Sequence, residues 1–217
     1  MKRHTLLAAI VAIILISAYV IAPTQALARQ KVIVIDAGHQ AKGNNAKEPI
    51  GPGSTKKKAK VSSGTRGIAT RVPEYKLNLK VALQLQKELT KRGYKVVMIR
   101  TTNNVTISNA QRSKIANKVH ADLLFRIHAN GAPSSKTHGY LTMVPASNQW
   151  TKPIVAKSLK AGKAIHKATL KTTGALNAGL VKSGSMTGFN WSKVPCVIAE
   201  MGFMSNRAED KKLQTST

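Results

Sequence analysis

The chain has 217 residues, and its 35 lysine and arginine residues outnumber its 8 acidic residues, giving a formal net charge of +27. This length suffices for one domain with a sizeable core, and the positive charge predicts an anionic partner or surface. Aromatic residues make up only 4% of the chain, too few for the stacking surfaces of single-strand or RNA binders. A basic DNA binder stays open as an alternative, but no motif supports it, so no nucleic-acid partner is expected. The single cysteine, Cys196, excludes an internal disulfide, and its apolar neighbours in the sequence predict a buried core residue.

The first 28 residues predict a signal for export. Lys2 and Arg3 precede an uncharged stretch over residues 5–22, and Ala26-Leu27-Ala28 matches a cleavage site of the Ala-x-Ala type. The alternative is an uncleaved N-terminal anchor, because eighteen uncharged residues can also span a bilayer. Both interpretations place residues 29–217 outside the cytoplasm, in the cell wall or at the outer face of the membrane. Anionic wall polymers or an anionic membrane surface are the partners that the charge favours there.

The first predicted strand ends in polar residues. Four β-branched residues at 32–35 are typical of a buried parallel strand, and they run directly into Asp36-Ala37-Gly38-His39. Ligands bind at the carboxyl ends of strands in open α/β sheets, so His39 marks a candidate site. Residues 40–73, rich in glycine, lysine and serine, predict a long basic loop. This loop is either a substrate-facing flap or a solvated surface segment.

Helix and strand patterns alternate along the remainder of the chain. Apolar residues repeat every four positions from Leu77 to Leu89 and predict a helix that begins near Pro73 and ends at Gly93. Further elements are expected as a strand at 94–99, a helix at 108–119 capped by Ser108, strands at 122–130 and 140–144, a basic helix at 153–169, a loop-rich stretch with one short strand at 174–191, and a strand at 194–199. The predicted fold is a single-domain, three-layer α/β structure with a mostly parallel or mixed central sheet flanked by helices.

Two histidines and two glutamates are the candidate chemical groups. His39, His128 and Glu200 each stand at the carboxyl end of a predicted strand, and Glu74 opens the helix between the first two strands. Two histidines and one carboxylate can bind Zn²⁺ and leave a position open for water, while a second glutamate serves as general base. The spacing of these residues is not that of a short motif. The residues alone therefore leave open either a metal hydrolase or a histidine pair with a structural role.

Four segments in this order carry a family resemblance: Ile35-Asp36-Ala37-Gly38-His39, Val72-Pro73-Glu74-Tyr75, Arg126-Ile127-His128-Ala129-Asn130 and Glu200-Met201-Gly202-Phe203-Met204-Ser205-Asn206. Together they resemble the zinc-dependent N-acetylmuramoyl-L-alanine amidases (amidase type 3) over about residues 31–212. The resemblance implies a phosphorylase/hydrolase-like fold with residues 29–217 as the catalytic domain. It implies His39, Glu74 and His128 as Zn²⁺ ligands and Glu200 as the catalytic base. The implied reaction is hydrolysis of the amide between N-acetylmuramic acid and L-alanine in peptidoglycan.

Two residues next to these positions have open roles. Asp36 either orients the side chain of His39 without binding the metal itself, or caps the turn that follows the strand. Asn130 either binds substrate or only completes its strand.

The C-terminal segment departs from the family pattern. Members usually carry a closing helix after a Glu-Asp-x-x-Leu segment, which residues 209–213 match here, and we expect that helix to be absent. The competing hypothesis is a non-catalytic basic protein that binds cell wall or another polyanion.

Overall fold

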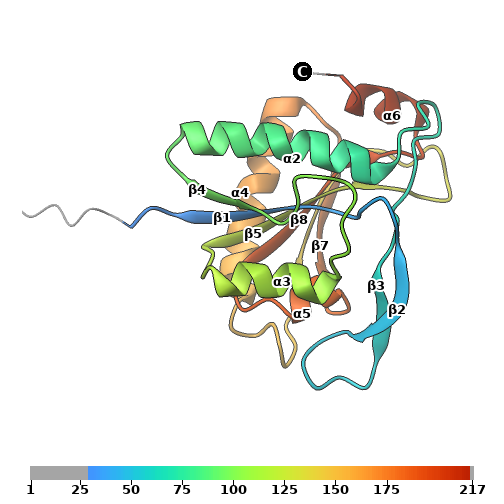
Figure 1. Ribbon diagram of the computed structural model, residues 1–217. Coiled ribbons are helices and arrows are strands. Elements are labelled where there is room, and N and C mark those ends of the chain that lie inside the picture. The colour runs from blue at the N-terminus through green and yellow to red at the C-terminus, as the bar shows by residue number, and fades with distance from the viewer. Residues whose placement is uncertain (1–28, 216–217) are drawn as a thin grey trace, which may run out of the picture. The chain divides into compact units, whose positions relative to one another are not determined.

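A six-stranded sheet forms the centre of the computed structural model, which describes residues 29–215 (Figure 1). The predicted signal peptide or anchor at 1–28 lies outside the described residues and stays a prediction. The strand order is β4-β1-β5-β8-β6-β7. The strands are β1 (Val32–Ala37), β4 (Lys95–Met98), β5 (Leu123–Asn130), β6 (Tyr140–Pro145), β7 (Asn177–Ser183) and β8 (Cys196–Phe203).

The sheet is mixed, as predicted. Strand β1 pairs in parallel with both β4 and β5, and β5 pairs in parallel with β8. Strand β6 runs antiparallel to β8 and parallel to β7. The carboxyl ends of β1, β5 and β8 therefore meet at one edge of the sheet, as the sequence predicted for the strands that end near His39, His128 and Glu200.

Helices cover both faces of the sheet. The helices are α2 (Glu74–Lys91), α3 (Asn109–Lys118), α4 (Val155–Thr173), α5 (Thr187–Asn190) and α6 (Arg207–Leu213). Ile35 and Ala37 of β1 pack with Leu79 and Ala82 of α2, while Val32 and Val34 join a cluster with Ala116 of α3. Both faces of β1 are thus buried, which explains its uninterrupted apolar sequence. Figure 1 shows α2 and α3 on opposite sides of the sheet, which confirms the three-layer prediction.

The start of α3 follows the predicted cap. The Ser108 side chain accepts a hydrogen bond from the Gln111 backbone N–H, and the Gln111 side chain accepts one from the Ser108 backbone N–H. This reciprocal pair satisfies two donors that a helix start otherwise leaves without partners. The helix that follows places Asn109 and Arg112 at the carboxyl edge of the sheet, where Arg112 contacts β1 and Asn109 contacts β5.

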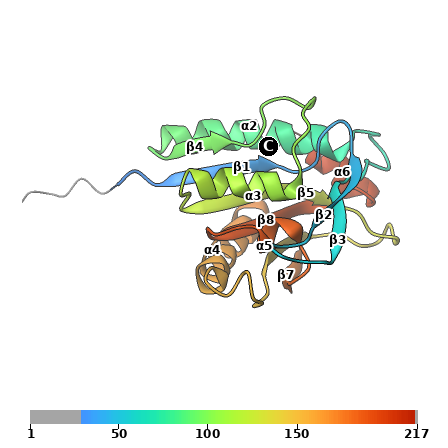
Figure 2. The same cartoon turned by 60° about the horizontal axis from the view of Figure 1, so that its bottom comes forward.

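The basic segment at 40–73 is not the expected loop throughout, because it contains a hairpin of β2 (Asn44–Pro49) and β3 (Lys57–Val61). These strands carry almost no apolar alternation, and polar contacts hold them to the domain. Glu48 accepts a hydrogen bond from the Ala110 N–H (3.1 Å), and the Asn109 side chain donates to the Lys60 carbonyl (2.9 Å). Figures 1 and 2 both place the hairpin beyond the carboxyl end of β1.

The C-terminal segment forms helix α6, capped by Asn206, whose side chain accepts from two backbone N–H groups. Asp210 on this helix is fully buried and accepts hydrogen bonds from the Ala69 and Thr70 N–H groups, both at 2.7 Å. The helix thereby fixes the chain just before α2. The expectation about a further closing helix stays a prediction. Within residues 29–215, no helix has the length and apolar character needed to cross a membrane.

Cys196 is buried at the start of β8, as predicted, and burial raises the pKa of its thiol to about 12. Because the thiolate is the reactive form, we expect Cys196 in the folded protein to resist thiol reagents at pH 8. Denaturation should make it react at once with one equivalent of reagent. Stoichiometric labelling of the native protein within minutes would contradict this burial.

Candidate metal centre

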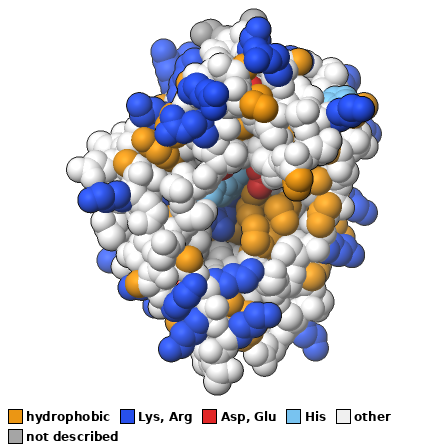
Figure 3. Space-filling model, turned by 90° about the vertical axis from the view of Figure 1, so that its right-hand side faces the viewer, with side chains coloured by type: hydrophobic (Ala, Val, Ile, Leu, Met, Phe, Trp, Pro, Cys, Tyr) orange, Lys and Arg blue, Asp and Glu red, His pale blue; other side chains and the backbone are white. Residues whose placement is uncertain are grey.

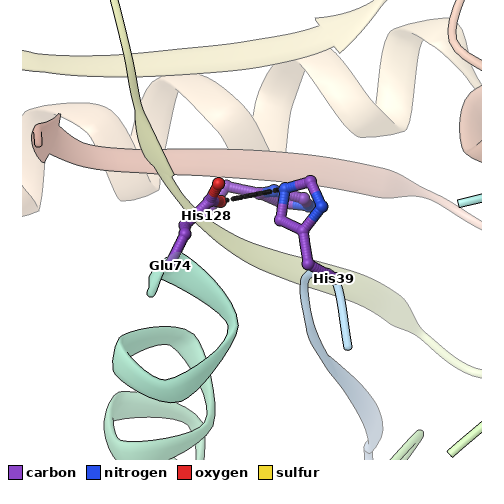
Figure 4. Close-up of side chains that lie close together, drawn as sticks. All are labelled: His39, Glu74 and His128. Atoms are coloured by element: carbon purple, nitrogen blue, oxygen red, sulfur yellow. Dashed lines mark hydrogen bonds and ion pairs between the residues drawn. The ribbon is translucent and has the colours of Figure 1, made fainter. Parts of the chain in front are cut away.

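Three elements bring two imidazoles and a carboxylate together at the carboxyl edge of the sheet (Figure 4). His39 follows β1, Glu74 is the first residue of α2, and His128 lies near the end of β5. His39 Nε2 lies 3.0 Å from Glu74 Oε1, and His128 Nδ1 lies 3.1 Å from the same oxygen. One donor atom from each residue falls within 4.8 Å of the others. The sequence prediction that these three side chains meet is confirmed by this geometry.

A backbone contact fixes the orientation of His39. Its Nδ1 lies 2.9 Å from the carbonyl oxygen of Ser62, and because a carbonyl only accepts, Nδ1 carries the hydrogen. Nε2 is then the nitrogen that faces Glu74 and His128, the arrangement usual for a metal-binding histidine. His39 also has a φ of 62°, a left-handed backbone conformation that is uncommon outside glycine and clusters at functional sites.

Glu74 is buried and held by backbone donors on both oxygens. Oε2 accepts from the Thr65 N–H (2.9 Å), and Oε1 accepts from the Ala129 N–H (3.2 Å) and the Asn78 side chain (3.1 Å). Burial by itself raises the pKa of Glu74, but hydrogen bonds from His128 and His39 outweigh it and hold the pKa well below its usual range. The carboxylate is therefore charged at neutral pH and suited to a cation.

Two glycines make room for these side chains. A Cβ at Gly64, which has a φ of +82°, would lie 2.6 Å from Glu74 Oε2 and 2.8 Å from His39 Cδ2. A Cβ at Gly38 would overlap the ring of His128. Both positions therefore need glycine for the three side chains to converge. The turn glycine before His39 was visible in the sequence, but nothing marked Gly64.

The donor set fits a divalent metal ion of the zinc type. Two imidazole nitrogens and one carboxylate oxygen form the protein part of a catalytic zinc site and leave a coordination position for water. Burial lowers the pKa of His128, which favours the neutral imidazole that binds metals. His128 Nδ1 is the nitrogen that faces the other two donors, because it lies 3.1 Å from His39 Nε2. His128 Nε2 points away from them and is buried without a hydrogen-bond partner among the described residues.

Glu200 stands beside this cluster without belonging to it. It is directly opposite His128 in the parallel pairing of β5 and β8, and it lines the same cavity of about 310 Å³. Burial is the largest effect on Glu200 and raises its pKa, and the negative charge of Glu74 raises it further. The pKa reaches about 8, although Arg126 lowers it in part. A carboxyl group with a pKa close to neutral pH is suited to both accept and return a proton.

The cavity opens on one face of the molecule. Figure 3 shows a hollow with histidine and acidic side chains in its floor, hydrophobic side chains beside them, and lysine or arginine around the rim. Lys58 of β3 and Ser185 both line this cavity, and the Lys58 ammonium donates to the Ser185 carbonyl (2.9 Å). The hairpin thus forms one wall of the cavity, in agreement with the flap interpretation of the basic segment.

Asp36 does not cap the turn after β1, and it reaches His39 only through an arginine. Its carboxylate is fully buried between Arg112 (2.6 Å) and Arg126 (2.7 Å) and makes no contact with the ring of His39. Arg112 donates in turn to the His39 carbonyl (3.1 Å), so Asp36 supports the site through the backbone. Asn130 lines the cavity, and its side chain accepts from the Gly131 N–H (2.8 Å).

Sequence reasoning missed several groups that support the site. Ser62 contacts His39 Nδ1 with both its carbonyl (2.9 Å) and its hydroxyl (3.1 Å), Thr65 contacts Glu74 through backbone atoms, and Arg100 donates to the carbonyls of Ala37 (2.8 Å) and Gly38 (3.0 Å). No local pattern distinguishes such residues from ordinary loop residues. Arg126 did carry a signal, because a charged residue inside the apolar run at 123–127 requires a buried partner.

Comparison with known proteins gives consistent matches. A family model described as N-acetylmuramoyl-L-alanine amidase matches residues 33–217. A putative N-acetylmuramoyl-L-alanine amidase of Buchnera aphidicola is 28% identical over 208 residues, covering 84% of this chain and 86% of that protein. The N-acetylmuramoyl-L-alanine amidase LytC of Bacillus subtilis is 28% identical over 147 residues, covering 68% of this chain but 28% of its own.

Solved structures share the fold. The N-acetylmuramyl-L-alanine amidase Ami1 of Mycobacterium smegmatis superposes with a TM-score of 0.74 at 22% identity, covering 86% of this chain and 88% of that chain. The catalytic domain of CwlV from Paenibacillus polymyxa gives a TM-score of 0.65 at 27% identity, with the same coverage of both chains.

Proposed function

This chain belongs to the N-acetylmuramoyl-L-alanine amidase family, and we propose that it hydrolyses the amide bond between N-acetylmuramic acid and L-alanine in peptidoglycan with the help of a zinc ion. The observation that carries this proposal is the convergence of His39, Glu74 and His128 next to Glu200 in one cavity. A non-catalytic wall-binding protein, the competing hypothesis, would have no use for this arrangement of buried polar groups.

The proposed roles follow from the contacts of each residue. His39, through Nε2, His128, through Nδ1, and Glu74 would hold the zinc ion. Zinc bound there supplies a Lewis acid for the scissile carbonyl, a nucleophilic water at neutral pH, and a positive charge that lowers the pKa of Glu200. Glu200, as a carboxylate, takes the proton of the attacking water and returns it to the nitrogen of the leaving L-alanine. Asn130 and Lys58 line the same cavity and are the candidates for contacts with substrate.

The location proposed for this activity is outside the cytoplasm. Peptidoglycan lies there, and the predicted signal or anchor at 1–28 would deliver the domain to it. The large positive charge of the chain would hold it near anionic wall polymers or near the outer face of the cytoplasmic membrane.

We expect chelation to abolish turnover. The purified protein, incubated with soluble muropeptides, should release stem peptides that carry a new L-alanine amino terminus. EDTA should stop this release, and added Zn²⁺ should restore it, while Mg²⁺ should not, because imidazole ligands favour zinc over magnesium. Mass spectrometry of the products and circular dichroism of the chelated protein would separate loss of metal from loss of fold.

Two results would contradict the proposal. Turnover that persists after exhaustive chelation would exclude the metal from the reaction. Folded, zinc-loaded protein that releases no peptide but binds insoluble wall material would favour the non-catalytic hypothesis.

A further inference from the structure

A second hollow of about 680 Å³ is lined by the turn of the hairpin, the second half of α3 and the segment that follows α5. Its principal lining residues are Trp150, Trp191, Lys114, Lys118, Lys193 and Pro52. We call this hollow the tryptophan groove. The amidase chemistry proposed above uses none of these residues.

The two indoles are fixed and partly exposed. The Trp191 Nε1–H donates to the Pro49 carbonyl (2.9 Å), and the Trp150 Nε1–H donates to the Pro52 carbonyl (2.8 Å). A Cβ at Gly51 would lie 2.6 Å from the Trp150 ring, so the hairpin backbone packs directly on this indole. Both rings thus remain half-buried as rigid apolar surfaces with their polar edges already satisfied.

Positive charge surrounds these apolar surfaces. The Lys114 ammonium lies 4.4 Å from the centroid of the Trp191 ring, and Lys118 and Lys193 are exposed at the rim. Within residues 29–215, none of these three lysines forms an ion pair, and no acidic residue lines the groove. Such a groove fits a ligand that combines apolar faces with anionic groups. A sugar ring has apolar C–H faces, and a carboxylate on that sugar supplies the charge.

The groove and the catalytic cavity share the same elements. Asn109 at the start of α3 lines the cavity, whereas Lys114 and Lys118 further along this helix line the groove. The rise of an α-helix puts Asn109 and Lys118 about 14 Å apart, which is within reach of a short polymer. The hairpin and the α5 segment also line both hollows, and Figure 1 shows them next to α3.

We propose that the tryptophan groove binds the glycan strand of peptidoglycan beyond the cleaved bond, with the lactyl carboxylates of N-acetylmuramic acid facing the lysines. This inference rests on the proposed amidase function and extends it to an anionic glycan subsite. The groove would hold the strand after the peptide has left, so that the protein stays on one strand between cleavages.

Tryptophan fluorescence tests this directly, because Trp150 and Trp191 are the only tryptophans of the chain. The full-length protein would be titrated with peptide-free glycan strands of alternating N-acetylglucosamine and N-acetylmuramic acid. We expect a saturable change in emission that weakens with added salt. A neutral chitooligosaccharide of equal length should bind much more weakly, and so should a single-stranded DNA of equal length, since it lacks the pyranose faces.

Charge-matched variants separate the groove from general electrostatics. Lys114→Ala combined with Lys118→Ala should weaken glycan binding by about tenfold, equivalent to about 1.4 kcal/mol. The control is Lys87→Ala combined with Lys160→Ala, two exposed lysines on α2 and α4 that change the net charge equally. All four side chains are exposed, so these variants should fold. The control should bind the strand as the wild type does.

The outcomes distinguish this inference from the amidase proposal. Cleavage of a small muropeptide should be unchanged in the Lys114/Lys118 variant, while cleavage of long strands should fall. Three results would overturn the glycan subsite even if the protein cleaves muropeptides. They are the absence of a saturable emission change, binding of DNA as tight as that of the glycan, and an equal loss of glycan affinity in both double variants. Glycan binding without any cleavage would instead overturn the amidase function and leave the groove as a binding site.

Discussion

Glu200→Gln should lower turnover of muropeptides by about 10²–10⁴-fold while zinc binding stays intact, because the proposed proton transfers lose their carrier. Glutamine has nearly the same shape but neither accepts nor returns a proton at neutral pH. Glu200 lies outside the group His39, Glu74 and His128, so the metal should remain at one equivalent. The measurements are kcat with a purified muropeptide and zinc content by elemental analysis.

A surface carboxylate provides the matched control. Glu88 on α2 is exposed and pairs with Lys91 at 3.0 Å, and Glu88→Gln should leave both turnover and zinc content unchanged. Turnover of Glu200→Gln within a few-fold of the wild type would remove Glu200 from the role of base. Loss of zinc together with turnover would instead show that Glu200 supports the metal centre.

Sequence reasoning located the site well because its residues stand at ends of strongly apolar strands. The runs at 32–35 and 194–199 could only be buried strands, so the polar residues that follow them had to meet at the sheet edge. The resemblance of four ordered segments then implied which of these residues would hold a metal ion and which would act as the base. The positions of the side chains at the strand ends were thus predictable from the chain alone, and their roles stay a proposal.

The remaining features depend on contacts between distant segments. The hairpin at 44–61 has polar strands whose attachment relies on Glu48, Asn109 and the two tryptophans, and no alternation of apolar residues announces it. Strand β7, seven residues long, contains no buried residue, so its sequence also lacks a strong apolar pattern. Thr65 contacts Glu74 through its backbone N–H and carbonyl, a role that any residue type except proline could have.

Asp36 shows how a buried charge can be misread in the sequence. Its place three residues before His39, a proposed metal ligand, suggested either support of that histidine or a cap of the turn that follows the strand. In the structure, two arginines from distant segments, Arg112 and Arg126, neutralise it instead. All three side chains are buried, and Arg112 continues to the backbone of His39. The cluster therefore joins the core of the domain to the backbone of His39.

Asp36→Asn should destabilise the folded protein by about 3–5 kcal/mol at pH 7, because it leaves two buried guanidinium groups without a counter-charge. Burial by itself raises the pKa of Asp36, but Arg112 and Arg126 outweigh it and hold the pKa far below its usual range. A carboxyl group whose pKa is lower in the folded than in the unfolded state contributes stability above its unfolded pKa of about 3.9. This contribution decreases as the pH falls below that value toward the folded pKa.

Denaturant unfolding of wild type and Asp36→Asn across pH would test both parts of this expectation. The difference in unfolding free energy should be full and constant above about pH 5 and should shrink as the pH drops below about 4, since the unfolded wild type then takes up a proton at Asp36 that the folded protein does not bind. Glu88→Gln, which removes a solvent-exposed carboxylate, should unfold like the wild type at neutral pH. A small, pH-independent difference for Asp36→Asn would mean that water or backbone carbonyls compensate the two arginines. The Asp36 carboxylate would then not be what connects the core to His39.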